Sequence, residues 1–368
     1  MERARERGVG VLIDFHALPG GANPHMHSGT SSGKAGLWSS SKNLALAKKC
    51  IVFVAEEIKR GKLEGVIGIQ ICNEAAYGAK GMWDWYEDVI SAVGGVDEGI
   101  PIYVSDGWDL KRAVEWLGKR KEGKGRRNPV VIDTHKYYTF NESDRAQSPQ
   151  QIIARIPSEL KVLDGKGVTV VVGEWSCVLD TKTWSRVRPE EKQGLVKEFG
   201  LAQSKRWREK TAGSYFWTWK MEWMDGGAWG FVEQVKKGNV VAPEYMGWSV
   251  EIVKEKGKVA REKREELGVK AKRAHEEYWG KKFPGKKMEH GWFGEGWDVG
   301  WEDAEVFFGS RGKGLLDGKV REGADKIGCF EIWVQKRQWE SGKKGAFVWE
   351  WEHGFRAGMA AYEKCVGI

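Results

Sequence analysis

No run of apolar residues in this chain of 368 residues approaches the roughly 18 that a membrane span requires. A secretory signal is also missing, because the charged segment Met1–Arg7 runs directly into the strand-like residues 9–13 and leaves no room for an apolar core and a cleavage site. These absences predict a soluble protein with no membrane partner, and a cytoplasmic location if the chain begins at Met1. A location outside the cell stays open if further residues precede Met1.

Cysteine is scarce and scattered. An odd count is a poor basis for a disulfide framework, and the spacing matches no metal motif. We therefore expect reduced and mostly buried thiols. The five cysteines are Cys50, Cys72, Cys177, Cys329 and Cys365.

The chain also lacks long segments in which all charged residues have the same sign. Its net charge is +8, but acidic and basic residues alternate through most segments, including residues 251–273. This mixing argues against a nucleic-acid partner. Tryptophan, in contrast, is abundant with 21 residues, and its flat rings suit sugar faces as well as protein cores.

Short apolar runs alternate with helix-type stretches from residue 8 to about 250, which predicts repeated βα units and a parallel sheet. The fold class is therefore α/β. Six units fall two short of a closed eight-stranded barrel. The expected strands are residues 9–15, 66–71, 101–105, 129–134, 168–173 and 214–219, and the expected helices between them are residues 41–59, 82–93, 110–117, 149–160 and 189–208.

Polar and aromatic residues follow the expected strands. In a parallel βα barrel the carboxyl ends of the strands face one cleft, where such residues indicate a site. Two of them are glutamates, and a converging pair of carboxylates is what cleavage of a glycosidic bond needs. The strand-end residues are His16, Asn73, Glu74, Asp106, His135, Glu174, Trp217 and Trp219.

From about residue 243 the sequence becomes charged and helix-favouring. We expect a barrel domain over residues 1–250 and a mainly helical extension over 251–368. Residues 296–304 resemble residues 354–361, since both place small residues four apart beside aromatics, which predicts two closely packed helices. Each segment follows a Glu-His-Gly triplet; for His290 and His353, helix packing is favoured over a metal or catalytic role, because no ligand set is evident around them.

Together, the strand-end motifs resemble those of glycoside hydrolase family five. The loop His16–Asn23 resembles most the fungal exo-β-1,3-glucanase-like branch. The resemblance extends over about residues 8–231, and its motifs are specific only in combination and in this order. They are Asn73-Glu74, His135-Lys136-Tyr137, Gly173-Glu174-Trp175 and Phe216-Trp217-Thr218-Trp219-Lys220.

The resemblance implies a retaining glycosidase that cleaves β-glucosidic bonds by double displacement. Glu74 would be the general acid/base and Glu174 the nucleophile. Asn73 would donate to the sugar 2-hydroxyl, while His135 and Tyr137 would orient the nucleophile or the sugar. A carboxyl separation of about 5–5.5 Å would fit this mechanism, against roughly 6.5–9.5 Å for inversion.

His16 would bind a sugar hydroxyl in the innermost subsite. Either Trp217 or Trp219 would lie beneath that sugar, since both project from the same side of a strand. Trp175 suits the core as well as a subsite, and Asp106 suits substrate contact as well as a helix cap.

The chain departs from the family pattern at its start, which corresponds to the third barrel strand. The missing second strand normally carries an arginine beside the nucleophile. Three explanations stay open: an incomplete chain, a gap covered by the C-terminal extension, or a degenerate relative. The alternative function is therefore a carbohydrate-binding remnant without turnover. No metal or organic cofactor is expected, and the oligomeric state is not indicated.

Overall fold

The structure is a computed structural model that describes residues 2–5, 9–121, 128–310 and 323–368. Residues 1, 6 and 7 of the charged segment Met1–Arg7 lie outside these ranges. The chain divides into two compact units, Met1–Val241 and Ala242–Ile368, and each is described by itself. Within the described ranges, no helix has both the length and the apolar character needed to cross a membrane.

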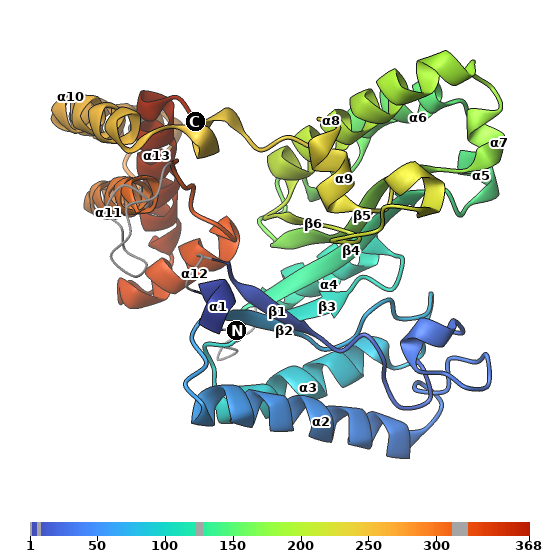
Figure 1. The fold of residues 1–368 in the computed structure, drawn as a ribbon. Helices are drawn as coiled ribbons and strands as arrows, with labels where there is room; N and C mark the ends of the chain where they lie inside the picture. Colours follow the sequence, from blue (N-terminus) through green and yellow to red (C-terminus); the bar gives the residue numbers. More distant parts are fainter. Residues whose placement is uncertain (1, 6–8, 122–127, 311–322) are drawn as a thin grey trace. The chain divides into compact units, whose positions relative to one another are not determined.

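The first unit contains one sheet of six parallel strands, paired in sequence order from β1 to β6. The sheet curls into a half-barrel (Figure 1), which confirms the predicted α/β barrel-like fold with six of eight strands. The strands are β1 (Val11–Asp14), β2 (Val66–Gln70), β3 (Ile102–Ser105), β4 (Val130–Tyr138), β5 (Val170–Leu179) and β6 (Ser214–Phe216).

Strands β1 and β2 each end one residue earlier than predicted, and three other strands end three or more residues from the predicted position. β4 and β5 continue past residues 134 and 173, because they keep pairing across register shifts, with His135 opposite Glu174. β6 ends before Trp217 instead of reaching residue 219. There the chain leaves β5, and Thr218 exchanges backbone hydrogen bonds with Trp229 and Phe231.

Helices between the strands pack their apolar faces on the outside of the sheet and form two hydrophobic clusters. Residues 156–158 and 189–191 are short 3-10 turns rather than parts of the predicted helices. Helix α2 starts where the Ser40 hydroxyl accepts the Asn43 amide. The helices of this unit are α1 (Glu2–Arg5), α2 (Ser41–Arg60), α3 (Met82–Val96), α4 (Leu110–Lys121), α5 (Glu142–Arg145), α6 (Pro149–Arg155), α7 (Thr181–Trp184), α8 (Lys192–Lys210) and α9 (Phe231–Lys236).

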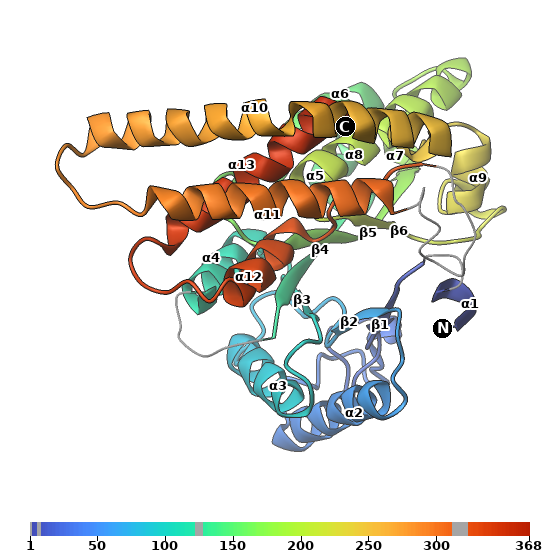
Figure 2. The ribbon, with the colours of Figure 1, turned by 90° about the vertical axis from the view of Figure 1, so that its left-hand side faces the viewer.

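The described part of the second unit is helical. Its helices are α10 (Val250–Lys282), α11 (His290–Gly309), α12 (Phe330–Glu340) and α13 (Val348–Val366). α11 and α13 cross closely (Figure 2), and a Cβ atom at Gly296 or Gly354 would lie 2.0 Å from the carbonyl oxygen of Trp351 or Phe293. The predicted pair of helices that meet through small residues is therefore confirmed.

All five cysteines are free thiols, as expected. Cys72 and Cys177 are buried, and burial raises the pKa of the Cys177 thiol to about 12. Cys50 is exposed, and the other two are half-buried. The expectation of mostly buried thiols was therefore wrong, because three of the five lie on partly or fully solvated helix faces or turns.

Candidate active site

A cavity of about 1120 Å³ opens at the carboxyl ends of the strands in the first unit. Its lining combines strand-end residues with the loop that follows β1. Six of the residues predicted from the sequence line it: His16, Glu74, His135, Tyr137, Glu174 and Trp217. The barrel geometry therefore brings together side chains that lie up to two hundred positions apart in the chain.

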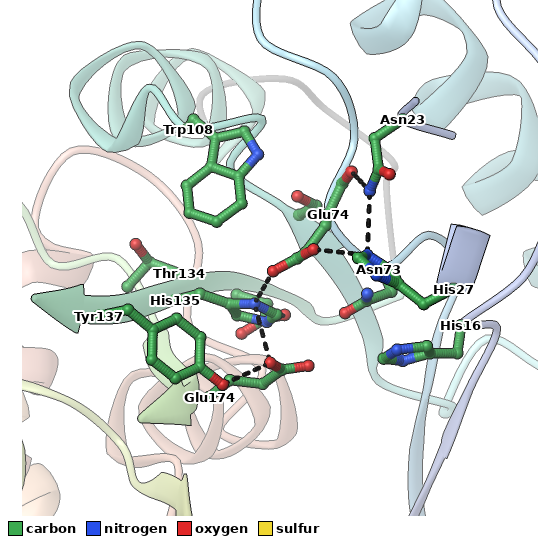
Figure 3. A network of polar contacts seen from close by, with 12 residues as sticks. His16, Asn23, His27, Asn73, Glu74, Trp108, Thr134, His135, Tyr137 and Glu174 are labelled. Carbon is green, nitrogen blue, oxygen red and sulfur yellow. Dashed lines mark hydrogen bonds and ion pairs between the residues drawn. The ribbon is translucent and has the colours of Figure 1, made fainter. Parts of the chain in front are cut away.

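The two glutamates face each other across His135 (Figure 3). Nδ1 of His135 lies 2.9 Å from Oε1 of Glu74 and 3.6 Å from Oε2 of Glu174. One carboxylate oxygen of each glutamate lies within 4.8 Å of the other. Glu74 has a φ of 43°, an uncommon value for a residue other than glycine and one that clusters at functional sites.

Asp133 is buried on the same strand as His135 and contacts the ring nitrogen of His135 that does not face the glutamates. A carboxylate oxygen of Asp133 lies 3.1 Å from Nε2 of His135 and accepts a hydrogen bond from the amide of Gln70. Asp133 requires a glycine at position 173 of the neighbouring strand, because a Cβ atom there would lie 1.8 Å from its Oδ1 atom. The glycine that precedes Glu174 thus makes room for the carboxylate that orients His135.

The electrostatics of the site are set by these contacts. Burial opposes charge on His135, but the carboxylates of Asp133, Glu74 and Glu174 raise its pKa well above the usual value. Burial also opposes charge on Glu74, yet hydrogen bonds and charge from His135 and His27 lower its pKa. The pKa of Glu174 is raised by burial, which His135 and Tyr137 offset only in part.

These directions run opposite to the roles that the resemblance implies, because the expected proton donor, Glu74, is the more acidic glutamate. The reason lies in the neighbours. Glu74 has two histidines at 2.9 Å, whereas His135, at 3.6 Å, is the one ion-pair partner of Glu174 within the described ranges. The arginine of the family pattern would lower the pKa of Glu174.

Sequence reasoning missed His27 and Asn23, which lie on the loop after β1. Nε2 of His27 lies 2.9 Å from Oε2 of Glu74, and Nδ2 of Asn23 donates to the Glu74 carbonyl at 2.8 Å. This loop extends over residues 15–40, between β1 and α2. Its irregular backbone carries no periodicity, so nothing in the sequence indicated which side chains turn inward.

Asn73 and His16 lie close to the two glutamates (Figure 3). Asn73 is buried, and its Nδ2 atom has no hydrogen-bond partner among the described residues. Nδ1 of His16 lies 2.8 Å from Asp14, and this hydrogen bond raises the pKa of His16. Buried donors are rarely left unpaired, but Asn73 is not part of the cavity wall, so its contact with a sugar hydroxyl stays a prediction.

Of the two candidate tryptophans, Trp217 lines the cavity. Trp219 is 64% exposed, stacks on Phe231 and is not part of the cavity wall. The two differ because the chain leaves the strand after Phe216, so strand alternation no longer applies to them. The cavity wall also has five aromatic residues that were not predicted, namely Tyr77, Trp108, Tyr138, Phe140 and Trp229.

Trp175 and Asp106 belong to the interior instead of the cavity wall. Trp175 is buried against Phe216 in the hydrophobic core. Asp106 accepts hydrogen bonds from the Thr134 hydroxyl and from the Trp108 amide. Asp109, not Asp106, accepts from an amide in the first turn of α4.

Glu74, His135 and Glu174 place ligand-type atoms within 4.8 Å of one another, the spacing of a possible metal site. The carboxylates around His135 raise its pKa well above the usual value, so a metal ion would have to compete with a proton for this imidazole. The arrangement therefore suits proton transfer and charge stabilisation better than metal binding. That the reaction needs no metal stays a prediction.

The half-barrel brings two glutamates together in one cavity. This arrangement defines the class of the protein as a glycoside hydrolase. Known relatives agree. A family model described as the glucan 1,3-beta-glucosidase 3 C-terminal domain matches residues 260–366. An uncharacterized glycosyl hydrolase of Saccharomyces cerevisiae is 30% identical over 99% of this chain and 68% of its own length, and glucan 1,3-beta-glucosidase 3 of Schizosaccharomyces pombe is 29% identical over 99% and 72%.

Among solved structures, a rutinosidase from Aspergillus niger superposes with a TM-score of 0.51. Its sequence is 19% identical, and the match covers 64% of this chain and 68% of that one, so it supports the fold alone. The chain belongs to glycoside hydrolase family five, in its fungal exo-β-1,3-glucanase-like branch.

Proposed function

We propose that this protein is a retaining β-glucosidase that acts on β-1,3-glucan or a related β-glucoside. The observation that carries the proposal is the pair Glu74 and Glu174, whose nearest carboxylate oxygens lie within 4.8 Å in a cavity of about 1120 Å³. That spacing suits direct attack on the sugar better than the wider gap that holds a water molecule in inverting enzymes. The names of the relatives supply the glucan substrate.

In the first step, the Glu174 carboxylate attacks the anomeric carbon. The bond from that carbon to the glycosidic oxygen breaks, and Glu74 gives its proton to the leaving oxygen. The Tyr137 hydroxyl, which donates to Glu174 Oε2 at 2.7 Å, keeps the nucleophile oriented. His135, as an imidazolium, stabilises the negative charge that the two glutamates share.

In the second step, Glu74, now a carboxylate, takes a proton from water while that water attacks the glycosyl ester and frees Glu174. Retention follows from two displacements at the same carbon. Glu74 must be protonated at the start, although its pKa is lowered in the free protein. A bound sugar excludes water from Glu74, and this desolvation raises the pKa of a carboxyl group.

A second candidate function is carbohydrate binding without turnover. One observation favours it: within the described ranges Glu174 has no lysine or arginine as an ion-pair partner, and burial raises its pKa. Such a protein would keep the cavity and its aromatic wall, and would still bind a β-glucan.

The deciding experiment follows the hydrolysis of laminarin and of an aryl β-glucoside by the purified chain, with proton NMR of the first sugar released. Retention of the β-anomer, abolished in Glu174→Gln, supports the proposed function. Release of the α-anomer overturns the retaining mechanism. A folded protein that binds laminarin but releases no sugar establishes the second candidate.

A further inference from the structure

The second unit contains a cluster of two histidines and one glutamate that the proposed reaction does not use; His275 and Glu350 are buried and His290 is half-buried. The seven histidines of the chain fall into two groups, and the three that follow residue 242 are His275, His290 and His353. All three gather around one point: the ring centroid of His275 lies 5.3 Å from that of His290 and 5.4 Å from that of His353. Three separate helix segments would not bring together every histidine of the unit without a cause.

Glu350 supplies the carboxylate at the centre of the cluster. Nε2 of His275 and Nδ1 of His290 each lie 3.0 Å from its Oε2 atom. Ligand atoms of the three residues all lie within 4.8 Å of one another. In a tetrahedral zinc site with bonds of about 2.0–2.1 Å, neighbouring ligand atoms lie roughly 3.3 Å apart, so the cluster needs little rearrangement to hold an ion.

Among the described residues, Glu350 is paired with two histidines and a backbone amide but with no permanent cation. Its side chain is completely buried, and among the described residues it meets no lysine or arginine, only the two histidines. A buried carboxylate is costly unless a cation or several donors compensate it. A divalent ion at Oε2 would provide that compensation.

The surroundings of Glu350 also suit a metal ligand. Its other oxygen, Oε1, accepts the backbone amide of Glu289 at 2.7 Å, which fixes the orientation of the carboxylate. Such outer contacts orient the ligands in metal sites. The backbone that carries this amide belongs to the turn between α10 and α11, so the turn is tied to α13.

We propose that His275, His290 and Glu350 form a zinc site that links α10, α11 and α13. Two imidazole nitrogens and one carboxylate oxygen are a ligand set that zinc accepts, with the fourth position taken by water or by the exposed His353. Binding requires that Nε2 of His275 and Nδ1 of His290 carry no proton. The earlier preference for helix packing over a metal role at His290 was based on the lack of a ligand set, and the structure supplies one.

The site would stabilise the helical unit instead of taking part in the sugar chemistry. It ties the end of the long helix α10 and the start of α11 to the first turn of α13. His275 stacks on Phe293 with ring centroids 4.0 Å apart, so one ligand is already held in place by packing. A preorganised ligand reduces the entropy lost when the ion binds.

The test uses the full chain, stripped with a chelator, freed of it, and titrated with zinc chloride by calorimetry. We expect one zinc ion per chain, confirmed by elemental analysis after dialysis. The variants His290→Gln and Glu350→Gln should weaken zinc binding by about 100-fold or more, since even changes around metal ligands cost 10–100-fold. His27→Gln, which removes a histidine beside Glu74 in the first unit, should leave the affinity for zinc unchanged.

Two further measurements keep the outcome clear if Glu350→Gln does not fold. Cobalt(II) should give visible absorption bands of a tetrahedral site in the wild type and in His27→Gln, but not in His290→Gln. Zinc should raise the melting temperature of the wild type and not that of His290→Gln. The proposal is overturned if the stripped chain takes up no stoichiometric zinc, or if His290→Gln binds zinc as tightly as the wild type.

Discussion

Nε2 of His135 lies 3.1 Å from a buried carboxylate oxygen of Asp133, while its Nδ1 atom faces the two glutamates. This relationship makes His135 a cation between three carboxylates. Within the described ranges it is also the cation that reaches Glu174. Asp133 is not part of the cavity wall, so we expect it to act on the proposed reaction only through His135.

The variant Asp133→Asn should move the alkaline limb of kcat/KM to lower pH. Removing the negative charge of Asp133 lowers the pKa of His135, so the imidazolium is lost earlier as the pH rises. The pH dependence of hydrolysis of an aryl β-glucoside with a good leaving group measures this shift, because that substrate needs little protonation by Glu74. A uniform loss of rate with an unchanged pH profile would show that Asp133 has only a structural role.

The same pair predicts how stability depends on pH. The pKa of His135 is raised in the folded state, so its contribution to stability is complete below about pH 6.5, the unfolded value, and is lost as the pH rises through the folded pKa. Asp133→Asn should therefore destabilise the protein more at pH 6 than at pH 10. Urea unfolding at the two pH values measures the difference, and an equal loss at both would contradict the ion pair.

His27→Gln should raise the pKa of Glu74, because the charge and hydrogen bond of His27 lower it in the wild type. Glu74 would then keep its proton to higher pH. If Glu74 is the acid, kcat/KM for a substrate with a poor leaving group should hold to higher pH than in the wild type. A substrate with a good leaving group, which needs little protonation, is the matched control and should show a smaller shift.

Azide separates the roles of the two glutamates. Glu174→Gln should lower kcat/KM by about 1000-fold or more, the scale of losing a nucleophile. Azide should then restore turnover of an activated β-glucoside by attacking the anomeric carbon once, giving an α-glucosyl azide. Glu74→Gln should instead give a β-glucosyl azide, because azide attacks the intact glycosyl ester. The opposite pattern of products would exchange the two assignments.

The sequence predicted the sheet and the two glutamates because both depend on local patterns. Apolar runs mark strands, and residues after parallel strands share one end of the sheet. It did not reveal His27 or Asp133. His27 lies on a loop without periodicity, and Asp133 sits within an apolar run, where its burial depends on Gly173 from the neighbouring strand.

The C-terminal helix pair also shows that local patterns can be predicted from sequence, whereas contacts between distant segments cannot. The repeated small residues predicted close packing, and Gly296 and Gly354 do lie against the facing backbone. The meeting of His275 with His290 could not be predicted, because it depends on how α10 returns alongside α11. Helix spacing within one segment carries no information about a contact between segments.

Trp217 and Trp219 offer a matched pair for the stacking hypothesis. Trp217 lines the cavity and Trp219 does not. Trp217→Ala should lower kcat/KM by about two- to tenfold, since a stacked ring contributes about 0.5–1.5 kcal/mol and 1.4 kcal/mol is a factor of ten. Trp219→Ala should change it much less, and equal losses would mean that the sugar also reaches the exposed ring.

The close crossing of α11 and α13 predicts a large effect from one added methyl group. In Gly296→Ala the new Cβ would lie 2.0 Å from the carbonyl oxygen of Trp351, so the helices must separate. We expect a loss of about 1–3 kcal/mol in the free energy of unfolding, the usual cost of overpacking. Gly280→Ala in α10 is the matched control, because its Cβ meets nothing within 4 Å and alanine favours a helix. Thermal unfolding should show a lower melting temperature for Gly296→Ala and an equal or higher one for Gly280→Ala; if both are as stable as the wild type, the helices do not approach as closely as described.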